Sequence, residues 1–98
     1  MSARFTWSMA KARANRQKHG VSFEEAVTVF ADPFARIHDD PEHSDEERRE
    51  IIIGHSAAGR LLLVSFTEHD QVVRLISARK ATRGEHEDYE EAPRRWKP

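Results

Sequence analysis

The sequence predicts an α+β domain: two N-terminal helices packed on an antiparallel sheet of three to five strands, with a further helix at the C-terminus. Capping boxes of the form S/T-x-x-E stand at residues 22–25 and 82–85 and predict the starts of two helices. Three apolar runs, at residues 50–55, 60–66 and 71–78, are separated only by short polar turns. Because short connections allow only antiparallel pairing, these runs are expected to be neighbouring strands of one sheet.

The N-terminal segment is expected to form a short strand and then a helix. Residues 4–7 alternate charged, aromatic, polar and aromatic side chains, which is typical of a strand. Ser8 can cap a helix that runs to about Lys18 over mostly strong helix formers. His19 and Gly20 are expected to end it, because glycine suits the left-handed conformation found at helix ends.

A second helix is expected to begin after Ser22. Its apolar positions at i, i+3, i+4 and i+7 predict one buried stripe, formed by Phe23, Ala26, Val27 and Phe30. Asp32-Pro33 is expected to end this helix. Residues 34–37 favour a short strand, and residues 39–47, which are acidic and lack apolar side chains, favour an exposed loop. Most of the phenylalanines, together with Trp7, are expected in the core.

The last helix is expected over residues 83–91, stopping before Pro93. A chain of 98 residues is long enough for one modest core. We therefore expect a single domain over residues 1–92, followed by a flexible tail over residues 93–98.

Composition excludes several classes of protein. The chain has no cysteine, which excludes disulfides and thiolate chemistry. No apolar stretch approaches the roughly 18 residues of a membrane span, and no signal-peptide layout is present, so a cytoplasmic protein is expected. The net charge of −1 conceals an uneven distribution. Residues 1–23 hold five basic and no acidic side chains, whereas residues 24–50 hold ten acidic and three basic ones. The basic end can face a polyanion.

The first candidate site lies on the first helix. Lys11, Asn15 and Lys18 fall on one helix face, with His19 at its end. Phosphodiester cleavage needs a proton acceptor near neutral pH, which histidine provides, and cations that hold the phosphate, which lysine provides. The alternative interpretation is a solvated amphipathic helix with a histidine near its C-terminal end.

The second candidate site connects the last strand to the last helix. Arg79, Lys80 and Arg83 stand just before or at the start of a capped helix. Helix N-termini bind phosphate through free amides, and the planar guanidinium of arginine matches phosphate geometry. The alternative interpretation is a surface connection that is basic for solubility.

A third cluster, containing His38, Asp39, Asp40, Glu42 and His43, has metal-binding side chains but no ordered ligand spacing. A solvated acidic loop is the better interpretation, so neither a metal nor a cofactor is expected. His55, His69 and His86 are expected to be surface residues, and Tyr89 is expected to face either the sheet or a site.

Two long stretches then carry a resemblance to a known family. These are KHGVSFEEA at residues 18–26 and ISARKATR at residues 76–83, with shorter matches from Phe5 to Glu90. The chain resembles the BrnT toxins of bacterial type II toxin–antitoxin modules over nearly its whole length. The resemblance implies a RelE-like ribonuclease fold and an endoribonuclease that arrests growth. It also implies a BrnA-type ribbon-helix-helix antitoxin, and binding to DNA only through the antitoxin complex.

The resemblance further implies cleavage without a metal, in which the ribose 2′-hydroxyl attacks the adjacent phosphate, so that the substrate is RNA. Expected catalytic residues are Lys18, His19, Arg79 and Arg83. Expected substrate-binding residues are Lys11, Asn15, Lys80 and Glu85. His19 is assigned as general base or acid, Lys18 and Arg79 as the phosphate clamp, and Arg83 as the phosphate holder at the helix start.

The sequence departs from the family pattern in two places. Ser8 stands where the family commonly has aspartate, although serine still caps a helix. Gly84, His86 and Glu87 occupy positions that are often basic, and the last helix is acidic. Weaker RNA binding and attenuated toxicity are expected from this helix. The alternative function is a catalytically weak homologue that acts as an antitoxin-binding co-repressor module.

Overall fold

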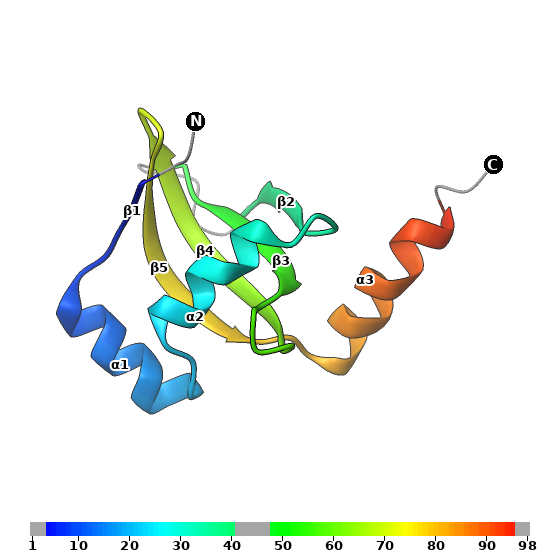
Figure 1. Ribbon diagram of the computed structural model, residues 1–98, viewed down its shortest axis with the longest axis horizontal. Helices are drawn as coiled ribbons and strands as arrows, with labels where there is room; N and C mark the ends of the chain where they lie inside the picture. Colours follow the sequence, from blue (N-terminus) through cyan, green and yellow to red (C-terminus); the bar gives the residue numbers. More distant parts are fainter. Residues whose placement is uncertain (1–3, 41–47, 96–98) are drawn as a thin grey trace.

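Five strands form one sheet in the order β1-β5-β4-β3-β2 (Figure 1). The computed structural model describes residues 4–40 and 48–95, and side chains up to residue 90. In chain order the elements are β1 (Arg4–Thr6), α1 (Met9–His19), α2 (Phe23–Thr28), η1 (Val29–Ala31), β2 (Arg36–Asp39), β3 (Glu50–His55), β4 (Leu61–His69), β5 (Val72–Lys80) and α3 (Arg83–Arg95). Figure 1 shows α2 lying across the sheet, with α1 and α3 at opposite ends of the long axis. The α+β fold predicted from the sequence is confirmed.

Strand pairing follows the lengths of the connections. The pairs β2–β3, β3–β4 and β4–β5 are antiparallel, as the short turns predict. The first strand differs, because β1 pairs with β5 in parallel, with Arg4 opposite Val72. The whole chain between these two strands serves as their connection, and this length makes a parallel pair possible.

The hairpin between β4 and β5 is longer than predicted. A turn was expected over residues 67–70, but both strands continue to a two-residue turn at Asp70 and Gln71. These residues have φ of 51° and 66°. Two successive positive φ values fit the right-handed twist of the flanking strands, so the strands can pair up to the turn itself. The prediction missed this because glutamine is an unusual residue for positive φ.

Three predicted element boundaries are also corrected. The second helix changes to the 3-10 form at Val29, which places this side chain in the core. Asp39 belongs to β2 and not to the predicted loop, of which residues 41–47 lie outside the described residues. α3 continues through Pro93 to Arg95. Pro93 lies in the last turn, where the missing amide removes one hydrogen bond and leaves the earlier turns intact.

The two faces of the sheet carry clusters of different size. The main core lies on the face covered by α1 and α2, and its fully buried side chains include Val21, Phe23, Val29, Leu62, Val64, Phe66 and Leu75. The predicted core aromatics pack here, with Phe30 edge-to-face against both Phe5 and Phe66 at 5.1 Å. The opposite face buries a small cluster of Ile53, Leu61 and Tyr89 under α3. The central strand β4 is therefore buried on the face toward α1 and α2, and on the other face it is buried only at its start, at Leu61.

Replacing Gly54 with Ala is expected to destabilise the fold by about 1–3 kcal/mol. A Cβ there would lie 2.8 Å from the Cβ of Ala35 and 3.0 Å from a carboxylate oxygen of Asp32. Thermal unfolding measures the effect, which should lower Tm by roughly 4–8 °C per kcal/mol. The matched control is Gly84→Ala in α3, where an added Cβ meets nothing within 4 Å. Equal Tm values for both variants would contradict the close packing at Gly54.

The described helices include none that is long and apolar enough to cross a membrane.

Candidate functional site

A basic groove of about 240 Å³ lies between α1 and β5. Its lining residues are Lys11, Ala14, Asn15, Lys18, His19, Ile76 and Ser77. The structure therefore brings together the four residues that sequence spacing placed on one side of the first helix. α1 contains no acidic residue, and its cap geometry is as predicted, with Ser8 accepting from the Lys11 amide and Gly20 in the left-handed conformation.

Asn15 holds α1 against the edge of β5. Its Nδ2 donates to the carbonyl oxygens of Val21 and Ala78, both at 2.9 Å, and its Oδ1 accepts from the Ala78 amide at 3.0 Å. Because β1 pairs with β5 only as far as Arg74, the Asn15 side chain occupies the edge beyond β1. The residue is 6% exposed, so its amide is committed to backbone partners. Asn15 is predicted to bind substrate, and it lines the groove, with its side-chain amide bound to the backbone of Val21 and Ala78.

The groove presents positive charge to solvent. Lys11 and Lys18 are exposed, and within the described part of the chain neither ammonium group has a carboxylate partner. His19 is half-buried at the helix end and likewise makes no hydrogen bond or ion pair there. Unpaired cations beside a half-buried imidazole are suited to binding a phosphate and moving a proton next to it.

Arg79 is held by Glu85. Its guanidinium donates from both terminal nitrogens to the two carboxylate oxygens, each at 2.9 Å. Glu85 also accepts from the Thr82 amide at 2.8 Å, while its own amide donates to Thr82 Oγ1, so the predicted capping box is confirmed. Glu85 is predicted to bind substrate, and in the structure its carboxylate pairs with Arg79. The hydrogen bonds from Arg79 outweigh burial and lower the pKa of Glu85 to about 2.

The ion pair makes a testable contribution to stability. Because the pKa of Glu85 falls from 4.5 to about 2 on folding, the stabilisation is complete above pH 4.5 and is lost as the pH falls toward 2. Glu85→Gln is expected to lower the free energy of unfolding near neutral pH, and its difference from the wild type should shrink between pH 4.5 and 2. Denaturant titrations across this range measure it. The exposed control Glu87→Gln should unfold like the wild type at neutral pH, and a pH-independent difference for Glu85→Gln would contradict the pairing.

Arg79 on β5 is not among the residues that line the groove of His19. Ser77 lines the groove of His19, and Arg79 lies two residues further along, on the same face of the strand. Among residues 4–40 and 48–95, no hydrogen bond or ion pair joins the imidazole to the guanidinium, and their expected convergence stays a prediction. Lys80 and Arg83 are both exposed at the junction between β5 and α3.

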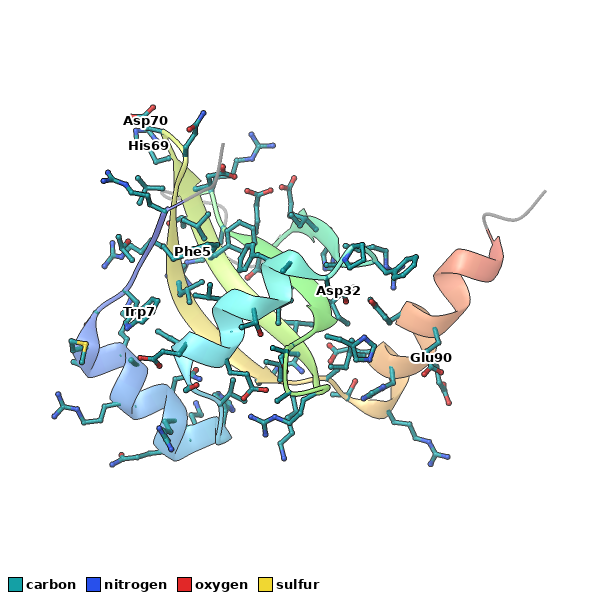
Figure 2. The ribbon with its side chains drawn as sticks, in the orientation of Figure 1. Phe5, Trp7, Asp32, His69, Asp70 and Glu90 are labelled. Atoms are coloured by element: carbon teal, nitrogen blue, oxygen red, sulfur yellow. The ribbon has the colours of Figure 1, made fainter. Side chains whose placement is uncertain are left out.

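α3 is anchored by a residue that the sequence did not single out as functional. The Asp32 carboxylate accepts from the Tyr89 hydroxyl at 2.7 Å and from the His55 and Phe34 amides at 2.7 and 2.9 Å. Burial alone would raise the pKa of Asp32, but these hydrogen bonds outweigh it and lower the pKa. The ring of Tyr89 packs edge-to-face on His55 at 5.2 Å. Figure 2 shows Asp32 on the side of the molecule that faces α3. These contacts fix the helix that carries Glu85.

A larger cleft of about 540 Å³ lies between this helix and the sheet. Its lining mixes basic, acidic and apolar side chains, namely Arg36, Ile37, His38, Ile53, Leu63, Glu85 and Asp88. Glu85 and Asp88 oppose the positive charge of Arg36, so this cleft does not offer a phosphate an unopposed cation. The smaller groove at α1 is therefore the better candidate site for a polyanion.

No group of three possible metal ligands comes together among the described residues. Of the cluster interpreted as a solvated acidic loop, His38 and Asp39 are exposed on β2, and Glu42 and His43 lie outside the described residues. His55, His69 and His86 are exposed, as predicted, and Tyr89 packs edge-to-face against the ring of His55.

Comparisons with known proteins agree with this architecture. Comparison with curated proteins gives no match. Among solved structures, the chain is similar to the ribonuclease toxin BrnT of Brucella abortus, with a TM-score of 0.66 and 20% sequence identity. The match covers 84% of this chain and 100% of that chain, and at this identity it shows the fold. The family model described as the ribonuclease toxin, BrnT, of type II toxin–antitoxin systems matches residues 7–85. The chain therefore belongs to the BrnT family of ribonuclease toxins.

Proposed function

We propose that this protein cleaves RNA without a metal ion, and that the substrate backbone lies in the groove between α1 and β5. The observation that carries the proposal is the set of Lys11, Lys18 and His19 in one groove, with no carboxylate paired to either lysine in the described residues. The BrnT family is one of ribonuclease toxins, which supports RNA as the substrate.

In the proposed reaction the ribose 2′-oxygen attacks the adjacent phosphorus while His19 accepts its proton. The bond between phosphorus and the 5′-oxygen breaks, and that oxygen takes up a proton. The products are a 2′,3′-cyclic phosphate and a free 5′-hydroxyl. Lys18 and Arg79 stabilise the charge that develops on the phosphate, and Lys80 and Arg83 hold neighbouring phosphates. Asn15 and Glu85 act as positioning residues, the first for α1 and the second for Arg79.

We propose further that the partner is a BrnA-type ribbon-helix-helix protein, through which the complex binds DNA, and that the protein acts in the cytoplasm. Family membership implies an antitoxin. Expression of the chain alone should arrest bacterial growth and deplete bulk RNA. Co-expression with the protein encoded by the adjacent reading frame should restore growth.

A catalytically weak homologue that acts as an antitoxin-binding co-repressor is the second candidate. The family match ends at residue 85, and the side chains of Glu87, Asp88 and Glu90 beyond it are acidic and exposed. Acidic side chains on α3 repel phosphate. Absence of growth arrest with or without the neighbouring protein would favour this second function.

Replacing Lys11 and Lys18 together with Ala is expected to weaken RNA binding. Each lysine that contacts a phosphate releases a counterion on binding, so the double variant should reduce the slope of log K against log salt by about 1.4 for single-stranded RNA. Binding isotherms at several salt concentrations measure this slope. The matched control is Arg13→Ala, because Arg13 lies on α1 but lines a different groove. An unchanged slope in the double variant would place the RNA elsewhere.

A further inference from the structure

α1 has a second basic side, formed by Arg13 and Arg16. These two side chains line a shallow groove of about 180 Å³ between α1 and α2. The rest of its lining consists of Met9, Ala12, Ser22, Phe23 and Glu24. None of these residues lines the groove at β5. The basic side chains of α1 are therefore divided between two grooves, Lys11 and Lys18 in one and Arg13 and Arg16 in the other.

The second groove is apolar as well as basic. Met9 is 69% exposed at one end of it, the largest exposure of any bulky apolar side chain in the described residues. Phe23 lies fully buried beneath the groove and packs edge-to-face on Trp7 at 5.9 Å. Figure 2 shows Trp7 beside the start of α1. A flexible, exposed methionine is suited to packing against an apolar side chain of a partner.

The positive charges of Arg13 and Arg16 in this groove favour a ligand that carries carboxylates. Arg13 and Arg16 are exposed, stand three residues apart on one helix face, and have no acidic partner within residues 4–40 and 48–95. Arginines in a partly apolar setting pair well with carboxylates of a binding partner, because the planar guanidinium donates two parallel hydrogen bonds.

RNA fits this groove less well than a peptide does. Phe23 is 0% exposed, so the groove offers no aromatic face on which a base could stack. Glu24 on the opposite rim would repel a phosphate, whereas a peptide backbone carries no charge there. The combination of two exposed arginines and an exposed methionine favours a protein segment.

We propose that the groove between α1 and α2 docks the antitoxin, through a segment that carries two carboxylates and an apolar side chain. The carboxylates pair with Arg13 and Arg16, and the apolar side chain packs against Met9. The proposal rests on the toxin function proposed above, which makes an antitoxin the expected partner. Under this proposal, one side of α1 binds RNA and the other side binds the antitoxin.

The test uses the full chain and the purified protein encoded by the adjacent reading frame. The double charge reversal Arg13→Glu and Arg16→Glu is expected to weaken the complex about 100-fold or more, because it replaces two attractive pairs by repulsive ones. RNA cleavage by this variant should stay at the wild-type rate. The matched variant, Lys11→Glu and Lys18→Glu, should lose RNA binding and keep the wild-type affinity for the antitoxin. Met9→Asp tests the apolar contact and should also weaken only the antitoxin complex.

Thermal unfolding establishes that the variants are folded, as expected for exposed positions. Unchanged antitoxin affinity in the arginine variant would overturn the proposal, and a loss of RNA binding in that variant would assign the groove to RNA. If the wild-type chain forms a dimer and the arginine variant does not, the groove would be assigned to a second copy of this chain. Failure of the toxin function itself looks different: the wild type would neither cleave RNA nor bind the neighbouring protein, and the docking proposal would fall with it.

Discussion

Arg79→Ala is expected to lower the rate of RNA cleavage by about 100-fold or more. Removing one preorganised donor from a phosphate or oxyanion site typically costs this much, because the donor acts where charge develops in the transition state. The guanidinium is already oriented by Glu85 through two hydrogen bonds of 2.9 Å. Its loss would also leave the Glu85 carboxylate without its arginine partner. Single-turnover cleavage of an RNA oligonucleotide measures the rate.

The matched control for this prediction is Arg74→Ala. Arg74 is exposed on the same strand, nearer the hairpin turn, and it pairs with Thr67 across the sheet. This variant should cleave RNA at the wild-type rate. Arg79→Lys keeps the charge but loses the planar geometry, so its rate should lie between those of the wild type and Arg79→Ala. Equal rates for Arg79→Ala and Arg74→Ala would remove Arg79 from the proposed phosphate clamp.

Asn15→Ala is expected to destabilise the fold by about 3 kcal/mol or more. The substitution removes three buried hydrogen bonds at once and leaves the amide and carbonyl of Ala78 without their partner. An unsatisfied buried polar group costs about 1–3 kcal/mol. For a domain of this size the midpoint of thermal unfolding should fall by roughly 12 °C or more. Circular dichroism against temperature measures it.

The control for Asn15→Ala is Gln17→Ala, a side-chain amide on the exposed side of the same helix. Its unfolding temperature should stay within a degree or two of the wild type. A small effect of Asn15→Ala would mean that α1 is held to β5 by its apolar contacts alone. In that case the groove that contains His19 would not depend on Asn15 for its shape.

Most of the fold could be predicted from the sequence because helix caps and short turns depend on residues that are close together in the chain. Ser8 and Ser22 cap the first two helices as expected, and Thr82 with Glu85 begins the third. The hairpin turn at Asp70 and Gln71 was missed because its residue types do not signal positive φ. The parallel pairing of β1 with β5 was also missed, because the two strands lie far apart in the sequence and local patterns do not indicate which distant strands pair.

The candidate site was predictable only in part for the same reason. Helical spacing placed Lys11, Asn15 and Lys18 on one face of α1 with His19 at its end, and all four line one groove. Spacing could not reveal that Asn15 is buried against β5, since two of its three hydrogen bonds are to the backbone of Ala78, 63 residues away. It also could not reveal the Asp32 carboxylate beneath α3, whose partner Tyr89 is 57 residues away. Long-range contacts of this kind require the folded chain.

The central claim is that RNA bound beside His19 is cleaved by its own 2′-hydroxyl. The most direct measurement compares cleavage, in the presence of EDTA, of an RNA oligonucleotide and of the same oligonucleotide with a single 2′-deoxy residue at the mapped cleavage position. The wild type should cut the RNA to a 2′,3′-cyclic phosphate and leave the deoxy position intact. His19→Ala should cut the RNA about 100- to 10,000-fold more slowly. Cleavage at the deoxy position, or wild-type rates from His19→Ala, would contradict the claim.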